Sequence, residues 1–152
     1  MKKILFIISV IGLLSFLSCK DINKFSAGSY PYAERYIINR SEKEVIDVIS
    51  KLKEDNPDYK VPKFQWAGKE TELSDGRDSH WYYFYFYFKD TNEIVEFWTR
   101  EGNNPNETKI GLVSIQKGLS LGNWKEVNKD LSDEENTEIK KEFKRNIIDK
   151  IK

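Results

Sequence analysis

A single histidine gives the chain its main opportunity for acid–base chemistry. His80 follows Asp78 in a polar stretch that also holds Asp75 and Arg77. An imidazole beside a carboxylate can transfer protons near neutral pH, so His80 with Asp78 would suit a hydrolase. No nucleophile is placed next to this pair, and a half-exposed histidine in a surface loop is the simpler interpretation. We therefore expect no catalytic residues and a protein that is not an enzyme.

Other sequence patterns for catalysis or cofactor binding are missing. The sequence has no Gly-x-Ser-x-Gly elbow, phosphate-binding loop, paired-histidine zinc motif or calcium loop. Several acidic residues would bind a cation if the fold gathered them, but their spacing gives no reason to expect it. These residues are Asp75, Asp78, Asp130, Asp133, Glu134 and Glu135. We expect no metal and no cofactor.

The only cysteine follows an apolar N-terminal segment. Lys2 and Lys3 precede residues 4–17, whose length is typical of the apolar core of a signal peptide and short for a membrane span. Leu17-Ser18-Cys19 resembles the end of the lipobox of bacterial lipoproteins, although Phe16 stands where leucine is usual. The resemblance implies cleavage before Cys19, a diacylglycerol thioether on its sulfur and acylation of the new amino terminus. An ordinary secretory signal and an uncleaved anchor helix are the alternatives.

These features divide the chain into a signal peptide (1–18), a lipidated tether (19–29) and one domain (30–152). Lys20 differs from the aspartate that retains lipoproteins in the inner membrane of enteric bacteria. Lys20-Asp21 is similar to the surface-export signal of lipoproteins in some other Gram-negative groups. The resemblance implies a protein of the cell envelope, anchored to a membrane through Cys19, with the outer membrane favoured and the leaflet open.

The charge of the mature chain argues against nucleic acid as a partner. It has 23 basic residues (25 less Lys2 and Lys3) and 25 acidic residues, a net charge of −2. Such a balance provides no basic surface for phosphates. With Cys19 lipidated, no disulfide can form within the chain, so the domain depends on its hydrophobic core.

Eight consecutive aromatic residues, 81–88, predict the central strand. Aromatic side chains suit the pleated surface of a sheet better than a helix. Alternate residues of a strand point to opposite faces, so Phe84, Phe86 and Phe88 share one face with Tyr82. We expect this phenylalanine-rich face to be core. The other face carries Trp81 and three tyrosines, whose polar tips suit a half-exposed surface.

The remaining patterns predict two helices and a few short strands. Ser41 and Ser132 each begin a Ser-x-x-Glu capping box, followed by apolar residues at helical spacing. We predict the first helix over 42–54 and a second after Ser132. Strands are predicted within 30–39, 61–67, 94–100 and 110–116, and loops over 69–79 and 118–124. The fold class is α+β: a single antiparallel sheet of about four to five strands with two helices packed on one face, in strand-helix-strands-helix order.

The sequence also predicts how the aromatic strand pairs with 94–100. If Lys89 faces Ile94, then Phe88 meets Val95, Phe86 meets Phe97 and Phe84 meets Thr99. A slip of one residue would instead bring Glu96 into the core. The opposite face then forms an outer patch, with a cation–π contact from its arginine to a neighbouring ring. This predicted patch consists of Tyr83, Tyr85, Tyr87, Trp98 and Arg100.

The outer patch leads to the main functional hypothesis. Exposed aromatic and arginine side chains mark binding surfaces, so we predict a non-catalytic module that binds another protein. The chain resembles small lipoproteins of Gram-negative bacteria, some of which neutralise antibacterial toxins, and toxin neutralisation is the most concrete version. An envelope glycan-binding lipoprotein is the alternative, and an enzyme using His80 is third. A structural alternative is that the N-terminal segment with Tyr30, Tyr32 and Tyr36 folds over the patch. Separately, Trp124 could plug the open end of the sheet.

Replacing Cys19 with serine removes the sulfur that would carry the lipid. We expect the Cys19→Ser variant to lose metabolic labelling with palmitate and to leave the membrane fraction. Ser18→Ala keeps a small residue at the cleavage site and should retain both properties. A wild-type chain that takes up no label would contradict the lipoprotein interpretation.

Overall fold

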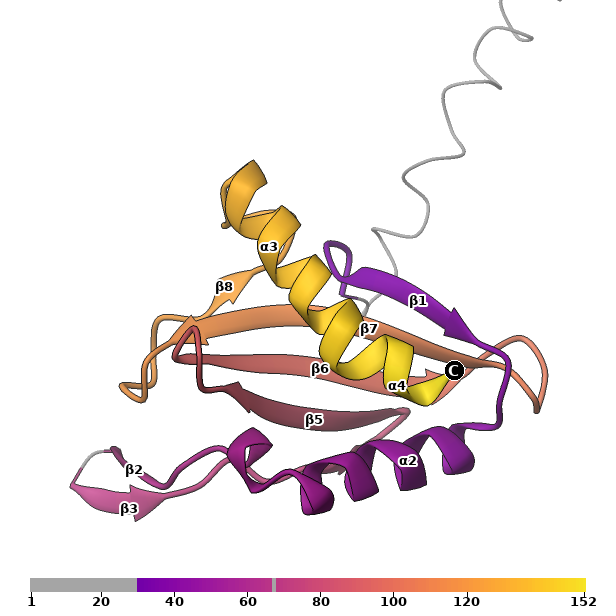
Figure 1. The fold of residues 1–152 in the computed structure, drawn as a ribbon, viewed down its shortest axis with the longest axis horizontal. Helices are drawn as coiled ribbons and strands as arrows, with labels where there is room; N and C mark the ends of the chain where they lie inside the picture. The colour runs from indigo at the N-terminus through magenta and orange to yellow at the C-terminus, as the bar shows by residue number, and fades with distance from the viewer. Residues whose placement is uncertain (1–29, 67) are drawn as a thin grey trace, which may run out of the picture. The chain divides into compact units, whose positions relative to one another are not determined.

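The computed structural model describes residues 30–66 and 68–152, and Tyr32–Lys152 form one compact unit (Figure 1). The predicted signal peptide (1–18), Cys19 and the tether (19–29) lie outside the described residues. Among the residues described, no helix is both long and apolar enough to cross a membrane. The elements are β1 (Glu34–Ile38), α2 (Glu42–Asp55), η2 (Pro57–Tyr59), β2 (Phe64–Trp66), β3 (Lys69–Thr71), β4 (Gly76–Asp78), β5 (Trp81–Phe88), β6 (Glu93–Glu101), β7 (Thr108–Lys117), β8 (Lys125–Glu126), α3 (Asp133–Phe143), η3 (Lys144–Ile148) and α4 (Asp149–Ile151).

The main sheet is antiparallel and has the strand order β1-β7-β6-β5-β4, with β8 paired to β7. Mixed helix and sheet with one main antiparallel sheet is as predicted, but six strands exceed the predicted four to five. The predicted element order is also too simple. Strand β2, within the predicted strand 61–67, pairs with β3 in a separate hairpin, and the predicted loop 69–79 contains both β3 and β4.

Both helices begin at the predicted capping boxes. The hydroxyl of Ser41 accepts a hydrogen bond from the amide of Glu44, whose carboxylate accepts one from the amide of Ser41. Ser132 and Glu135 repeat this arrangement at the start of α3. These bonds satisfy amide groups that have no partner within the helix. The C-terminal helix widens into the π-helical turn η3 before ending in α4.

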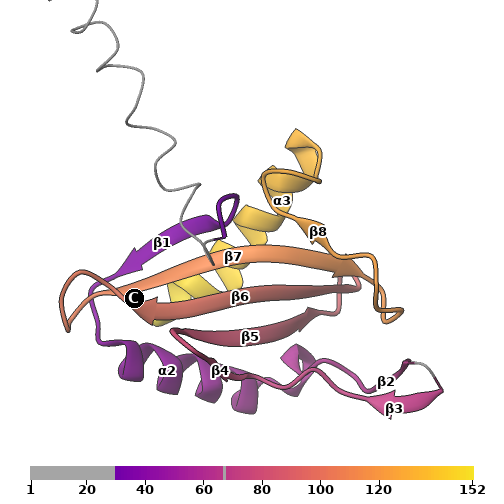
Figure 2. The ribbon, with the colours of Figure 1, turned by 180° about the vertical axis from the view of Figure 1, so that it is seen from behind.

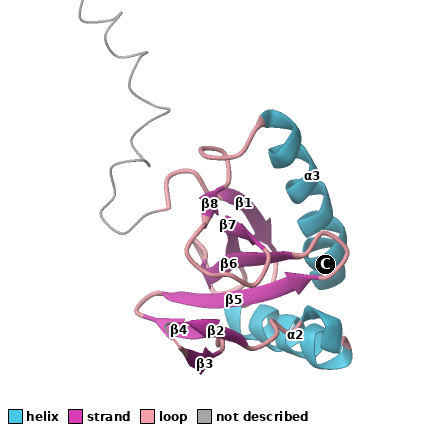
Figure 3. Cartoon of the chain, turned by 90° about the vertical axis from the view of Figure 1, so that its left-hand side faces the viewer, coloured by secondary structure: helices cyan, strands magenta, loops and turns pink. Residues whose placement is uncertain are grey.

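The core lies between the sheet and the two helices. Phe84 and Phe86 have no exposed surface, and Phe97 of β6 lies between them and Phe143 of α3. Helices α2 and α3 lie on the same side of the sheet (Figures 1 and 3). The helices contribute apolar side chains to this core, namely Val45, Ile49, Ile139, Phe143, Ile147, Ile148 and Ile151. The prediction of a phenylalanine-rich core face is confirmed.

The predicted pairing of β5 with β6 is wrong by two residues. Phe88 pairs with Glu93 and not with Val95. The chain reverses over residues 89–92, where Asn92 adopts a left-handed conformation (φ 54°) that asparagine tolerates well. Every side chain still lies on its predicted face, because a shift of two residues leaves the alternation unchanged.

Strand β7 changes its side-chain phase at a β-bulge. Leu112 and Ser114 pair with adjacent residues of β6, which leaves Val113 as the extra residue. Leu112 and Ile115 are three residues apart, so in a regular strand they would point to opposite faces. The bulge allows both to face the core.

An ion pair covers the edge of β5 where β4 stops. Strand β4 reaches only as far as the pair Gly76–Tyr83 (Figure 2). Beyond it, a carboxylate oxygen of Asp75 accepts the amide of Tyr85 at 2.9 Å, and the ammonium of Lys53 donates to the carbonyl of Tyr85 at 2.6 Å. Lys53 and Asp75 also form an ion pair at 2.8 Å, with side chains only 13% and 19% exposed. The two side chains therefore take the place of a neighbouring strand.

Gly111 lies directly beneath the indole of Trp98, its partner across β6 and β7. A Cβ atom built at Gly111 would approach the Trp98 ring to 2.2 Å, well inside van der Waals contact. Glycine is therefore required here by the close approach of the ring.

Replacing Gly111 with alanine should force the indole of Trp98 out of its place. We expect the free energy of unfolding to fall by about 1–3 kcal/mol, as for other overpacked sites. The matched control is Gly76→Ala, because a Cβ at Gly76 meets nothing within 4 Å. Urea unfolding of both variants measures the difference, and equal stabilities would contradict this packing.

Candidate binding site on the open face of the sheet

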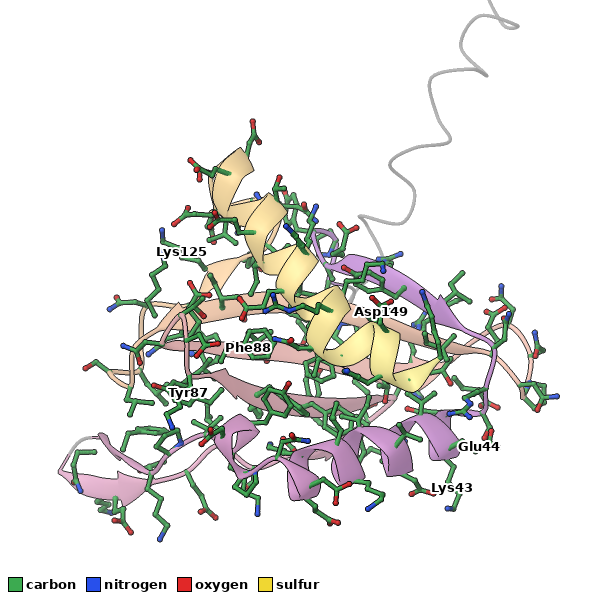
Figure 4. The ribbon with its side chains drawn as sticks, viewed as in Figure 1. Lys43, Glu44, Tyr87, Phe88, Lys125 and Asp149 are labelled. Atoms are coloured by element: carbon green, nitrogen blue, oxygen red, sulfur yellow. The ribbon has the colours of Figure 1, made fainter. Side chains whose placement is uncertain are left out.

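The face of the sheet opposite α2 and α3, here called the outer face, carries a row of rings from β5. Trp81, Tyr83, Tyr85 and Tyr87 are all partly exposed, whereas the alternate residues from Phe84 onward are buried. Figure 4 labels Tyr87 and Phe88 at the end of the strand, and Phe88 belongs to the core that the helices share. The predicted difference between the two faces is confirmed.

Trp98 of the neighbouring strand β6 packs against this row and is itself only 2% exposed. Its ring meets Trp81 edge-on, with 4.4 Å between the ring centroids. On the other side it covers Gly111. Trp98 was predicted as a contact residue, and the structure places it as a buried base on which Trp81 rests.

Arg100 lies over the same pair of indoles. Its guanidinium carbon is 4.8 Å from the centre of Trp81 and 6.0 Å from that of Trp98. The predicted cation–π contact is therefore present, with Trp81 as the nearest ring. The Nε atom of Arg100 is buried and makes no hydrogen bond within the described part of the chain. The partly exposed guanidinium and Trp81 form one ordered unit.

A largely buried carboxylate lies next to this unit. The register places Glu96 opposite Tyr85, whose hydroxyl donates to its Oε1 at 3.4 Å. The hydroxyl of Ser114 donates to Oε2 at 2.6 Å. Burial raises the pKa of Glu96, and the two hydrogen bonds offset part of that rise. Burial, together with the nearby Glu96, raises the pKa of Tyr85 to about 12. Tyr85 thus remains a neutral donor at physiological pH.

The loop after β7 covers one end of the outer face. Gln116, which is fully buried, accepts hydrogen bonds from the amides of Gly122 and Asn123 and donates to the carbonyl of Ser120. The loop is thereby fixed, and Trp124 at its end meets Tyr85 edge-on at 6.2 Å. Trp124 thus packs on the middle of the row, whereas the alternative was a plug at the end of the sheet.

The predicted cover from the N-terminal segment is not formed by Tyr36. Its ring packs on Phe143 of α3, 5.6 Å between centroids, and so lies on the core side of the sheet. Tyr32 is 38% exposed and lies beneath the ammonium of Lys129.

Tyr87 is the member of the predicted patch that lies farthest along β5. Its hydroxyl donates a hydrogen bond to Asn92 at 2.8 Å.

His80 is exposed in the turn between β4 and β5, after Ser79 in a left-handed conformation (φ 56°). Asp78 is also exposed, and no hydrogen bond joins it to His80. Within residues 30–66 and 68–152, no three histidine, cysteine or acidic side chains are grouped so as to hold a metal ion. Of the acids considered as cation ligands, Asp75 is engaged by Lys53 and Glu135 by Lys117.

Comparison of the chain with protein-family models, with curated proteins and with solved structures finds no match. Functional inference therefore depends on the site itself. Sequence reasoning missed Glu96 as part of this site, because its carboxylate is brought to Ser114 only by the pairing of β6 with β7. A charged residue inside an otherwise apolar and aromatic strand was the available signal.

Replacing Glu96 with glutamine removes a buried charge and keeps the shape of the side chain. The folded state raises the pKa of Glu96, so ionisation opposes folding once the pH exceeds the pKa of the unfolded chain. The stability of the wild type should therefore fall relative to Glu96→Gln as the pH rises from about 4 to 7. Urea unfolding at both pH values measures this, and a constant difference would contradict it.

Proposed function

We propose that this chain is a non-catalytic, membrane-anchored envelope lipoprotein that binds another protein through its outer face. The observation that supports it most is the ordered unit of Trp81 and Arg100, held on the buried Trp98 and continued by the tyrosines of β5. Tryptophan, tyrosine and arginine are the residues that contribute most at protein interfaces.

The packing of the outer face reduces the cost of binding. Trp81 is fixed between Trp98 and Arg100, and Tyr85 is fixed by Glu96 and Trp124. Side chains that are already ordered lose little entropy when a partner covers them. Trp98 would then act by holding Trp81 in place, and Tyr83 and Tyr87 would extend the contact along the strand.

The location of this activity comes from the sequence of residues 1–29. A lipid on Cys19 would hold the domain at a membrane, with the outer membrane favoured by Lys20. Restricting the protein to a membrane surface raises the frequency of encounters with envelope proteins. Neutralisation of an incoming toxin is the most concrete form of this function.

Glycan binding is the second candidate, and one feature favours it. Tyr85 and Trp124 form an aromatic corner beside the carboxylate of Glu96. Tryptophan and tyrosine faces stack on sugar rings, and a carboxylate can accept hydrogen bonds from sugar hydroxyls. The same outer face would then serve an envelope polysaccharide.

Affinity capture from envelope extracts with the full-length protein in detergent tests this proposal. We expect capture of a specific protein, and we expect Trp81→Ala and Arg100→Ala each to weaken its binding about tenfold or more. Tyr32→Ala, which removes an exposed ring outside the outer-face row, is the matched control and should bind as the wild type does.

Thermal unfolding of each variant shows that lost binding is not lost folding. Undiminished capture by folded Trp81→Ala and Arg100→Ala variants would overturn the outer face as the site. Retention of polysaccharide, with no protein captured, would replace the proposal by glycan binding.

A further inference from the structure

A pocket of about 270 Å³ opens at the end of β5, away from the Trp81–Arg100 unit. Its walls come from η2, from the turn after β5 and from the junction of α3 with η3. Tyr59 of η2 forms an aromatic wall, since its ring is fixed on Phe86 and Phe88 at 5.3 and 6.2 Å. The lining residues that carry charge or form the aromatic wall are Asp58, Tyr59, Lys89, Asp90, Glu142 and Arg145.

The pocket adjoins a piece of the edge of β5 that pairs with no other strand among the described residues. The amide and carbonyl of Tyr85 point away from β6, as their hydrogen bonds to Asp75 and Lys53 show. Main-chain groups two residues apart in a strand point the same way, so those of Tyr87 face the same edge. Strand β4 ends its pairing at Tyr83, and no ladder partner reaches Tyr87 on this side within the described residues.

The charges of the pocket favour a cation. Lys89 pairs with Asp58 at 3.3 Å, and Arg145 with Glu142 at 3.8 Å. Asp90 makes no ion pair within the described residues, so the lining has one carboxylate in excess. Burial raises the pKa of Glu142, Arg145 offsets part of that rise, and repulsion from Glu93, Asp90 and Glu138 adds smaller increases. A positive group brought into the pocket would relieve this repulsion.

We propose that this pocket receives a lysine or arginine side chain from an extended segment of a partner protein, and that the segment's backbone pairs with Tyr87. The alkyl stem of the side chain would pack on Tyr59, and its charged end would reach Asp90 and Glu142. Backbone pairing at an open edge gives affinity, and the side-chain pocket gives selectivity. This site requires neither the lipid anchor nor the Trp81–Arg100 unit, so it stands or fails separately from the function proposed above.

Peptide titration of the ¹⁵N-labelled full-length protein in detergent micelles tests the pocket. The probe is the capped peptide acetyl-Thr-Val-Lys-Val-Thr-amide, compared with peptides that carry alanine or glutamate in place of lysine. We expect the lysine peptide to shift amide resonances at 87–90 and at 142–146. Its affinity should exceed that of the alanine peptide about tenfold, and the glutamate peptide should bind still more weakly.

Two protein variants test whether the carboxylate of Glu142 binds the lysine of the peptide. Glu142→Gln should weaken binding of the lysine peptide about three- to tenfold. Glu134→Gln changes the net charge equally, but the residue is exposed and outside the pocket lining, so it should have no effect. Equal effects of the two variants, equal binding of the lysine and glutamate peptides, or shifts confined to other parts of the chain would overturn the proposal.

Methylation of peptide nitrogens tests the backbone pairing. One probe carries a methyl group on the backbone nitrogen of its lysine, and another carries one on the backbone nitrogen of each valine. Each probe therefore blocks a different edge of the extended peptide. Only one of them should lose binding, because the segment pairs with β5 along one edge. Equal binding of both probes would show that the edge at Tyr87 is not used.

Discussion

Phe97 joins the two layers of the domain. Its ring has no exposed surface and lies 5.2 Å from Phe84, 5.4 Å from Phe86 and 5.0 Å from Phe143. Because interiors are close-packed, this contact fixes which face of β5 and β6 turns toward the helices. The rings of Trp81 and the three tyrosines are then left on the opposite face. The candidate binding surface is thus a consequence of how the core is filled.

The elements that local patterns determine were predicted well. Capping boxes and helical spacing located α2 and α3, and two-residue alternation assigned both faces of β5. The pairing of β5 with β6 was wrong because alternation determines only whether a shift is odd or even. The remaining choice depends on the turn at 89–92, where the conformation of Asn92 brings Phe88 opposite Glu93.

The candidate site was predicted less completely, because its details depend on strands that are distant in the sequence. The burial of Trp98 requires Gly111 from β7 and Trp81 from β5. The environment of Glu96 requires Ser114, whose orientation follows from the β-bulge. Neither a bulge nor the close approach of a ring to a glycine leaves a periodic signal. Residue types could therefore indicate the surface but not which of its members are exposed.

The outer face combines rigid and polar elements. Trp81 and Arg100 form one end, and Tyr85, Glu96 and Trp124 form the middle, with Gln116 fixing the loop that carries Trp124. Aromatic surface supported in this way has a fixed shape. A surface of fixed shape selects among partners by fit, whereas a flexible one adapts to many.

The arrangement around Lys53 has a consequence for chemical labelling. Its ammonium makes three hydrogen bonds, two to Asp75 and one to the carbonyl of Tyr85. An amine attacks an acylating reagent through its free lone pair, so this nitrogen reacts only when the edge of the sheet opens and these hydrogen bonds break. Exposed amines such as that of Lys43 react without any opening and supply the reference rate. The modification rate of Lys53 therefore reports how often Lys53 separates from the edge of β5 in an otherwise folded molecule.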